Sequence, residues 1–508
     1  MLNFNNRFMR KKSLIGLIRD SFKALRPSLL ALGALAFMFV SCAQDGFDDE
    51  SFDGGVYNTQ LETPTAEDIS VKSSDDGTRL IISWPLVYGA GGYHAVLTNL
   101  TTEEVVKDSI IDNNAFSAPR IEENNYELTL QVLGNTEKNN TGGELVLKAF
   151  NTFTPAFGTI PSGTDLNAFF AETTLPEQKD AIAFDLEQGG TYQLTDVLDF
   201  GNKYVVLRST GTHATITTSP GACFMFGNGI KLQNIDIDAT DNTANGLLLM
   251  SNTPDESLSI EALGYKDKGA NQTGFVMTNP VTLKNVNVKG LKKSLIYGNK
   301  TNWSLLGLMI DGCMVQLDNE ESMGVINMYG ASNGLIKSMT ICNSTFYNLK
   351  KNSTAYFLRY GNSSNAQPRK IFGNGETAVL TLTNNTFANV FTDKDFANNL
   401  ANTDAVTTIL TDNIFYDVYR VYQFVQTNTK RTARNNFVWW VNTPKQTNDI
   451  TRTDSNGNPL CTEADPGFPT IDALTPMDLS QPNGGANFVP SGLPLENRAG
   501  DPRWLPTE

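Results

Sequence analysis

One pattern recurs between residues 230 and 440: a short run of alternating apolar residues, an Asn or another small residue, and a second apolar run. We take seven positions as equivalent: Asn234, Asn285, Gly312, Asn343, Asn384, Asp412 and Asn435. Short strands that follow one another at this spacing predict stacked coils, and therefore an all-β chain containing a right-handed parallel β-helix. Propellers and jelly rolls are disfavoured, because the intervals lack Asn-Gly or Asp-Gly hairpin turns at regular spacing.

The equivalent Asn residues have a structural role in this interpretation. Amide side chains on successive coils can stack as a hydrogen-bonded ladder that satisfies the polar groups of the turns. The predicted helix spans residues 156–442, and its longest polar insertions, 252–272, 362–376 and 391–404, should leave the coils as loops. The Pro- and Gly-rich segment 443–508 is expected to be a tail that caps the open end of the helix, because an uncovered terminal coil is an exposed edge.

A different pattern covers residues 61–155, where short alternating strands are separated by turns. About seven such strands in this length predict a β-sandwich. Trp84 lies in an early strand, Tyr93 begins the next, and Tyr126 lies in a late one, an arrangement that resembles a fibronectin type III module. Trp84 and Tyr126 are then core residues, and the module is interpreted as a spacer.

The first 41 residues are typical of an exported protein. Basic residues such as Arg7 and Arg10 precede the apolar stretch from Leu29 to Val40, which is too short to cross a bilayer comfortably. Ser41-Cys42 follows and resembles the lipobox of bacterial lipoproteins, so Cys42 is expected to be acylated. Residues 42–60 are acidic and should form an extended tether. The location implied is the outer membrane, lipid-anchored and facing the cell exterior.

Charge and cysteine content narrow the choice of partners. The formal net charge is −15 although the first 41 residues are basic, so the remainder is more acidic still. Nucleic acid is excluded as a partner, because phosphate binding needs a basic face. An anionic polysaccharide would need a bridging cation such as Ca²⁺. The four other cysteines, Cys223, Cys313, Cys342 and Cys461, show no CxxC spacing and are expected to be buried free thiols.

Taken together, the lipobox, the fibronectin-like module and the Asn-punctuated coils resemble uncharacterised surface lipoproteins of bacterial polysaccharide-utilisation systems, with a helical domain of the pectate-lyase-like superfamily. This resemblance implies an extracellular polysaccharide as ligand, and an outer-membrane glycan importer as a partner. Hydrolases of that superfamily use paired aspartates and a His, whereas this chain has only His94 and His213 and no Asp-Asp pair in the coils. The lyase signatures are also absent.

A residual set of charged residues keeps a lyase open as an alternative. Arg359 lies in the middle of a strand, and Lys350, Lys351 and Asp311 belong to neighbouring coils. In a Ca²⁺-dependent uronate lyase, Arg359 would be the base, Lys351 the uronate clamp and Asp311 the calcium ligand. The competing interpretation is a solvated charged face, which any β-helix carries.

Aromatic residues favour binding without catalysis. Trp439 and Trp440 are adjacent in a strand, so they should point to opposite faces. Tyr297, Tyr329 and Tyr360 each precede a Gly and are expected to form a column on three coils, which would lie in the core or form a platform for sugar rings. We therefore predict a non-catalytic polysaccharide-binding protein that needs no cofactor, with a structural adhesin as a further alternative. The predicted glycan-binding residues are Tyr329, Arg359, Tyr360, Trp439 and Trp440.

Overall fold

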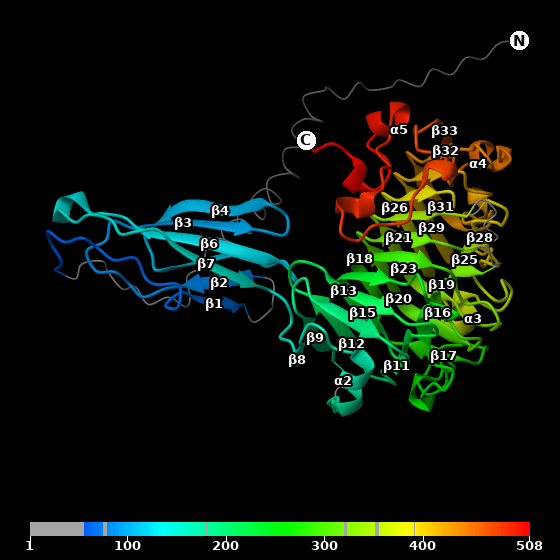
Figure 1. Cartoon of the computed structure of the whole chain (residues 1–508), viewed down its shortest axis with the longest axis horizontal. Coiled ribbons are helices and arrows are strands. Elements are labelled where there is room, and N and C mark those ends of the chain that lie inside the picture. The colour runs from blue at the N-terminus through cyan, green and yellow to red at the C-terminus, as the bar shows by residue number, and fades with distance from the viewer. Residues whose placement is uncertain are drawn as a thin grey trace, which may run out of the picture. The chain divides into compact units, whose positions relative to one another are not determined.

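The computed structural model describes residues 55–74, 79–177, 180–319, 323–350, 355–390 and 392–507. The chain forms two compact units that divide between Thr154 and Pro155 (Figure 1). Both are built mainly from strands, which make up 39% of the structure against 9% helix. The predicted signal peptide, Cys42 and the start of the acidic tether lie outside the described residues.

The first unit is a sandwich of two antiparallel sheets. One sheet has the strand order β1-β2-β5, with bounds Ser70–Ser73, Arg79–Ser83 and Ala115–Pro119. The other has the order β4-β3-β6-β7, with bounds Glu104–Ile111, Tyr93–Asn99, Asn125–Val132 and Val146–Asn151, and the short helix η1 covers Thr136–Lys138. Trp84 and Tyr126 are 3% and 1% exposed, so both lie in the core as predicted. The sandwich is confirmed; its assignment to the fibronectin type III family stays a prediction.

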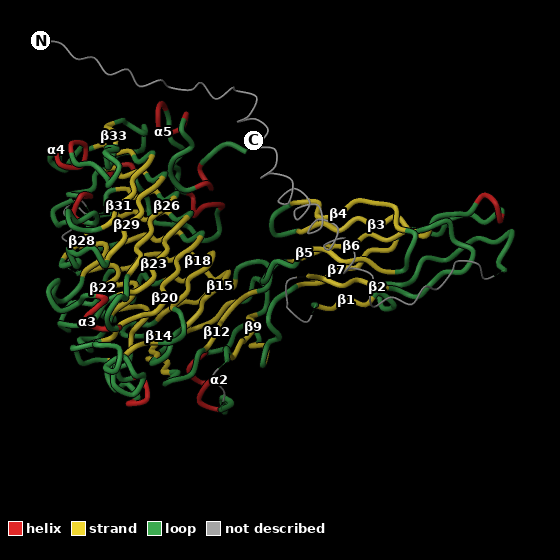
Figure 2. Tube along the Cα trace, turned by 180° about the vertical axis from the view of Figure 1, so that it is seen from behind, coloured by secondary structure: helices red, strands yellow, loops and turns green. Residues whose placement is uncertain are grey.

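The second unit is a parallel β-helix, because almost every strand pairs in parallel with the equivalent strand of the next coil. Most coils contribute to three faces, which we name A, B and C in chain order, and the last strand of face C is β28. Figure 2 shows the strands stacked as rungs from β9 to β33. The predicted fold class is confirmed.

The strands of the three faces have the following bounds. Face A consists of β8 (Gly158–Ile160), β9 (Ile182–Leu186), β12 (Val205–Ser209), the first part of β15 (Ile230–Asp238), β17 (Phe275–Met277), the first part of β18 (Val281–Leu291), β20 (Trp303–Asp311), β23 (Ile336–Cys342), β26 (Ala378–Thr383), β29 (Val406–Thr411) and β31 (Lys430–Arg434). Face B consists of β10 (Thr191–Leu194), β13 (Ala214–Thr218), the second parts of β15 and β18, β21 (Met314–Leu317), β24 (Thr345–Asn348), β27 (Thr386–Ala388), β30 (Ile414–Tyr416), β32 (Phe437–Trp439) and β33 (Thr462–Glu463). Face C consists of β11 (Val197–Asp199), β14 (Cys223–Phe226), β16 (Gly246–Met250), β19 (Ser294–Tyr297), β22 (Gly324–Asn327), β25 (Tyr356–Arg359) and β28 (Ala397–Asn398).

The corner between faces A and B holds the predicted Asn ladder. All seven equivalent positions adopt the left-handed backbone conformation, with φ from 51° at Asn285 to 64° at Gly312. Asn and Gly tolerate this conformation better than other residues. Neighbouring side chains are bonded, as in Asn285 Nδ2 to Asn234 Oδ1 at 2.9 Å. The predicted stacking of the ladder is therefore confirmed.

A second, fully buried ladder lies one residue further along the chain, and the sequence pattern did not reveal it. Asn385 Nδ2 donates to Asn413 Oδ1 at 3.0 Å, and Asn413 Nδ2 donates to Asn436 Oδ1 at 2.9 Å. All three side chains are inaccessible to solvent. The next layer of the core is aromatic: Phe346, Phe387 and Phe415 stack on consecutive coils with centroid separations of 5.4 and 5.2 Å.

Both ends of the β-helix are covered. At the start, α2 (Leu166–Glu172) buries Leu166, and Phe170 packs against Phe184 and Phe200. At the far end, α4 (Thr447–Thr451) precedes β33, which adds a last parallel rung beside β32. The beginning of the tail thus adds the last rung at the far end of the helix.

The rest of the tail does something different from the prediction, since it runs back over the outer side of face B. It contains η4 (Ile471–Ala473), η5 (Pro482–Gly485), α5 (Gly492–Glu496) and η6 (Pro502–Trp504). Phe468, Phe488 and Trp504 pack there against strand residues that include Tyr347 and Tyr416. From β21 onward the outside of face B carries apolar residues such as Met314 and Ile414 beside hydroxyl groups such as that of Thr345, and the tail buries this surface.

The first two insertions do not stay separate loops. The segment 252–272 contains η2 (Glu256–Leu258) and the segment 362–376 contains α3 (Pro368–Phe372). They pack together through Tyr265 and Phe372, whose ring centroids are 5.4 Å apart, and through backbone bonds such as Asn374 N to Lys268 O. The remaining short helix, η3 (Val421–Gln423), follows β30.

Two further observations complete the description. Cys223, Cys313, Cys342 and Cys461 are free thiols; three are buried and Cys342 is partly exposed, close to the prediction. Within the residues that the structure describes, no helix is both long and apolar enough to cross a membrane.

Candidate functional site

Arg359 is stacked between two tyrosines at the end of face C. Its guanidinium carbon lies 3.6 Å from the ring centroid of Tyr329 and 4.7 Å from that of Tyr356. Arg359 ends β25, Tyr356 begins the same strand, and Tyr329 follows β22 on the preceding coil. Tyr329 is 46% exposed, so much of its ring remains available to solvent. Two of the predicted glycan-binding residues are thus in contact.

Local backbone features hold this corner in place. Arg359 is in register with Asn327 of the preceding coil, and Asn327 Oδ1 accepts a hydrogen bond from the backbone N of Tyr329 at 3.0 Å. Gly324 lies beside them, and a Cβ there would be 3.0 Å from the Cβ of Arg359. Such a contact would be tighter than ordinary packing. The absence of a side chain at Gly324 therefore leaves room for the Arg359 side chain.

The arrangement suits recognition of a sugar bearing a carboxylate. A partly exposed aromatic face stacks on the C–H face of a sugar ring, and a planar guanidinium matches a carboxylate. Cation–π stacking also restricts the rotamers of the arginine before any ligand arrives. We refer to Tyr329, Tyr356 and Arg359 together as the Arg359 corner.

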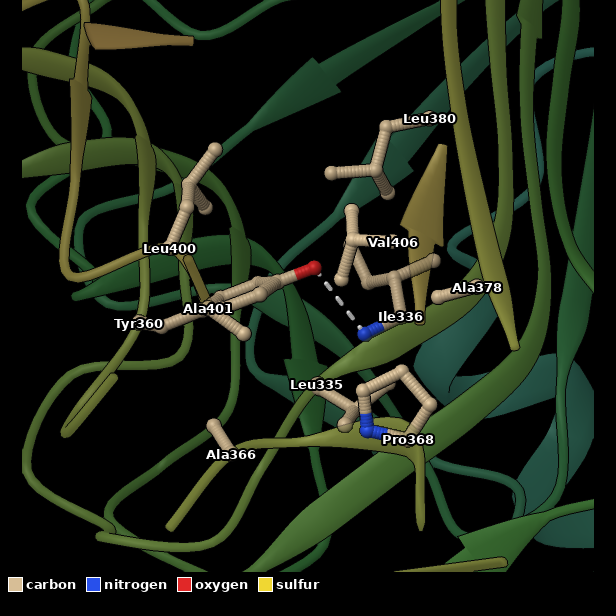
Figure 3. Close-up of a pocket in the computed structure, with 10 residues that line it drawn as sticks. All are labelled: Leu335, Ile336, Tyr360, Ala366, Pro368, Ala378, Leu380, Leu400, Ala401 and Val406. Atoms are coloured by element: carbon tan, nitrogen blue, oxygen red, sulfur yellow. Dashed lines mark hydrogen bonds between the residues drawn. The ribbon is translucent and has the colours of Figure 1, made fainter. Parts of the chain in front are cut away.

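Tyr360 does not belong to this surface, and its prediction as a binding residue is wrong. Its side chain is 3% exposed, and its hydroxyl accepts a hydrogen bond from the backbone N of Ile336 at 3.1 Å. Figure 3 shows the ring inside an apolar pocket with neighbours such as Leu380 and Leu400. Burial raises the pKa of its hydroxyl well above the usual range. Tyr360 is a core residue, because it follows Arg359 and so points to the opposite side.

The aligned tyrosine column is also absent. Tyr297 is in register with Asn327, and Asn327 is in register with Arg359. Tyr329 therefore lies two residues beyond the position of Tyr297, and Tyr360 lies one residue beyond the position of Arg359. The shared Tyr-Gly dipeptide was misleading, because turn length differs between coils.

The two tryptophans point to opposite sides, as the strand period predicted. Trp440 packs against the helix core, and its Nε1 donates to Val418 O at 3.1 Å. Trp439 packs against the apolar cluster beneath the tail. Both are partly buried by the protein's own side chains. Neither forms an open platform like Tyr329.

The residues of the lyase alternative are not brought together. Asp311 lies in the ladder corner between faces A and B, where its Oδ1 accepts a hydrogen bond from Asn343 at 2.8 Å. Arg359 lies at the end of face C, so the whole width of face A separates them. Lys350 pairs with Asp318 at 3.3 Å, and Lys351 lies outside the described residues. Among the described residues, no three His, Cys, Asp or Glu side chains form a group that could hold a metal ion.

A polar cluster that the sequence interpretation missed lies on the first coils of face B. His213 Nδ1 is 2.7 Å from Asp236 Oδ1, and Asn287 donates to the same oxygen at 2.8 Å. Two residues on, Asp238 pairs with Lys289 at 3.1 Å. The signal was available, because Asp236 and Asp238 alternate along one strand and share a face.

Hydrogen bonds stabilise one carboxylate of this cluster in its ionised form. Burial alone would raise the pKa of Asp238, but hydrogen bonds from Thr240 and Lys289 outweigh it and lower the pKa. The lowered pKa suits the ion pair that Asp238 makes with Lys289. Nearby, a polar groove of about 500 Å³ runs between the ladder residues Asn285 and Asn343 and the tail residues Asn483 and Arg503.

Comparisons with known proteins add little beyond the fold. A family described only as a domain of unknown function matches residues 19–193. No curated protein matches this chain. Among solved structures, it is similar to an alginate lyase of the PL6 family, AlyGC, at 13% identity, TM-score 0.31 and 57% coverage of this chain. The chain spans 41% of the length of that lyase.

Two pectate lyases are more complete in coverage but more distant in shape. Pel3 of Pectobacterium carotovorum is 11% identical, with a TM-score of 0.16. The match covers 80% of this chain and 89% of the Pel3 chain. PelI of Erwinia chrysanthemi, solved with tetragalacturonic acid, has 12% identity and a TM-score of 0.13, with 80% and 88% covered. The assignment of a parallel β-helix rests on the strand pairing of this chain.

Proposed function

We propose that this chain is a lipid-anchored cell-surface protein that binds an extracellular polysaccharide without cleaving it, and that a pectic, uronate-bearing glycan binds at the Arg359 corner. The observation that carries the proposal is the stack of Arg359 on the exposed ring of Tyr329. The sugar ring would lie on Tyr329 and its carboxylate beside the guanidinium. Ca²⁺ would strengthen binding by bridging the acidic chain and an acidic polymer.

Binding is preferred to lyase chemistry for a geometric reason. A lyase requires its base close to a cation that acidifies the proton to be removed. The one carboxylate proposed for that cation, Asp311, is bonded within the Asn ladder on another corner. No observation on the described residues favours the lyase, and none points specifically to an adhesin.

The cellular setting belongs to the same proposal. Acylation of Cys42 would anchor the chain in the outer membrane, and the acidic tether and the sandwich would hold the β-helix away from the bilayer. An outer-membrane glycan importer would then be a natural partner, since a surface protein that captures polymer serves uptake.

The test compares two exposed tyrosines. Tyr329→Ala removes the platform and should weaken binding to polygalacturonate about tenfold, equivalent to about 1.4 kcal/mol. Tyr88→Ala is the matched control, because Tyr88 is similarly exposed, at 50%, but lies in the sandwich. Affinity electrophoresis measures both. Equal retardation of the wild-type protein and both variants would contradict the proposed site.

A second variant separates charge from shape. Arg359→Lys keeps the positive charge but loses the planar stacked group, so it should also weaken binding. If Arg359→Lys bound like the wild-type protein, the corner would act only as a diffuse positive charge.

A further inference from the structure

The outer side of face A over β23, β26 and β29 carries no charged side chain at its nine alternating outward positions. Strand residues alternate between the core and the outside, so every second residue belongs to this surface. Six of them carry hydroxyl groups: Ser338, Thr340, Thr381, Thr383, Thr407 and Thr411. All six are partly or largely exposed. We name this surface the hydroxyl strip.

Charge borders the strip, beginning within β23 itself, where Lys337 pairs with Glu376 at 2.6 Å near the start of the strand. Asp311 ends β20 on the preceding coil, and Lys430 and Arg434 are exposed on β31 of the following one. Thr is common at exposed strand positions, so the hydroxyl groups alone do not set this surface apart; the absence of charge at nine neighbouring outward positions does. Nine outward positions on three consecutive coils without a charge, in a chain of net charge −15, therefore form a neutral surface that the Lys337–Glu376 pair borders.

The hydroxyl groups are arranged in rows along the helix axis. Thr383 is in register with Thr411, and Thr411 Oγ1 donates to Thr383 Oγ1 at 2.9 Å. Thr340 is in register with Thr381 of the next coil. Parallel strands place such rows about 4.8 Å apart from coil to coil, and outward residues about 6.6 Å apart along a strand. The Asn ladder, with Asn343 and Asn384, borders one edge with amide groups.

We propose that the hydroxyl strip is a second binding surface, which takes a neutral polysaccharide chain lying along the helix axis with about one sugar unit per coil. Charge selects this occupant, because a surface without cations or anions neither attracts a polyuronate nor repels an uncharged glycan. Hydroxyl and amide groups in rows offer the donors and acceptors that sugar hydroxyls need. The strip shares with the proposed function the assumption that the ligand is a glycan, but uses a different face and a different sugar class.

The experiment uses two polymers and three variants of the full chain. Thr381→Lys places a long, positively charged side chain at the centre of the strip. Tyr329→Ala disables the Arg359 corner, and Thr217→Lys puts the same charge on exposed face B as the matched control. Affinity electrophoresis in neutral galactan and in polygalacturonate measures each. Thr381→Lys should weaken galactan binding at least tenfold and leave polygalacturonate binding unchanged, whereas Tyr329→Ala should do the reverse.

Each other result has a defined meaning. The strip is overturned if Thr381→Lys binds galactan as the wild-type protein does. It is also overturned if the wild-type protein binds polygalacturonate but not galactan. Either result leaves the Arg359 corner standing. If the protein binds galactan but not polygalacturonate, the Arg359 corner is overturned and the hydroxyl strip stands. If sedimentation velocity shows a wild-type dimer that Thr381→Lys dissociates, the strip is an interface with a second copy and the proposal is wrong. Thermal melting checks that the variants fold, and Thr407→Lys replaces Thr381→Lys if that variant does not.

Discussion

At the scale of single residues, the buried carboxyl of Asp449 illustrates how position sets chemistry. It lies in α4 at the far end of the helix, where its side chain is inaccessible and its Oδ1 accepts a hydrogen bond from Tyr422 N at 2.8 Å. Burial raises its pKa to about 7, against the opposing effects of backbone hydrogen bonds from Tyr422 and Val421 and of the charges on Arg452 and Arg420. The folded state therefore holds this proton more tightly than the unfolded chain does.

The pH dependence follows from that direction. Because the folded pKa is above the unfolded one, the protonated group contributes most at acidic pH, and stability is lost as pH rises from about 4 through about 7. Asp449→Asn should remove this loss. The free energy of unfolding of the variant minus that of the wild type should therefore rise by about 2 to 4 kcal/mol between pH 5 and pH 8. Urea unfolding at the two pH values measures the change.

A matched carboxyl provides the control. Burial alone would raise the pKa of Asp454, but hydrogen bonds from Ala433 and Asn458 outweigh it and lower the pKa. Asp454 is ionised at both pH values, so Asp454→Asn should lower stability equally at pH 5 and pH 8. Parallel pH profiles for wild type and Asp449→Asn would contradict the account of Asp449.

At the scale of structural elements, the inner Asn ladder is the strongest constraint on the coils. Asn413 donates to Leu382 O at 3.0 Å and Thr411 O at 2.8 Å, and its own oxygen accepts from Asn385 at 3.0 Å. Asn413→Leu leaves several buried groups unsatisfied, so we expect a loss of about 2 to 4 kcal/mol in the free energy of unfolding. Asn413→Ser should cost less, because Ser344 occupies the equivalent position on another coil. Similar losses for Leu and Ser would mean that shape, rather than hydrogen bonding, sets the ladder.

The same scale shows what the sequence could and could not reveal. The outer ladder was predictable from Asn234 onward, because a left-handed corner residue is nearly always Asn, Asp or Gly. These residue types recur at the same place in each repeat of the sequence. Tyr360 was misplaced because a shared Tyr-Gly dipeptide says nothing about the length of the preceding turn. A one-residue shift of register moves a strand side chain from the surface to the core. The contact of Tyr329 with Arg359 depends on that register, so only the three-dimensional structure gives it.

At the scale of the whole molecule, faces A, B and C present different surfaces. The tail covers the apolar part of face B, the Arg359 corner lies where β25 of face C ends, and face A presents the hydroxyl strip. The tail was predicted only as an end cap, because its apolar residues Phe468, Phe488 and Trp504 are far apart in sequence and match face B only after folding. Long-range packing of this kind leaves no local pattern to detect.

The membrane anchor is also a property of the whole molecule. Cys42→Ala should prevent acylation, so that the protein is released from the membrane or remains unprocessed. Fractionation of cells followed by immunoblotting measures this, with Cys461→Ala as a control at a cysteine buried in the β-helix. A Cys42→Ala protein that stayed membrane-bound at normal molecular weight would contradict the lipoprotein proposal.

Binding without cleavage is the central claim, and one paired measurement tests it most directly. The wild-type protein is incubated with polygalacturonate, with and without Ca²⁺, while affinity electrophoresis records binding and ultraviolet absorbance records the unsaturated uronate that a lyase would release. Our account predicts retarded migration, strengthened by Ca²⁺, and no new absorbance under either condition. Ca²⁺-dependent absorbance that disappears in Arg359→Ala would contradict it and identify the chain as a uronate lyase.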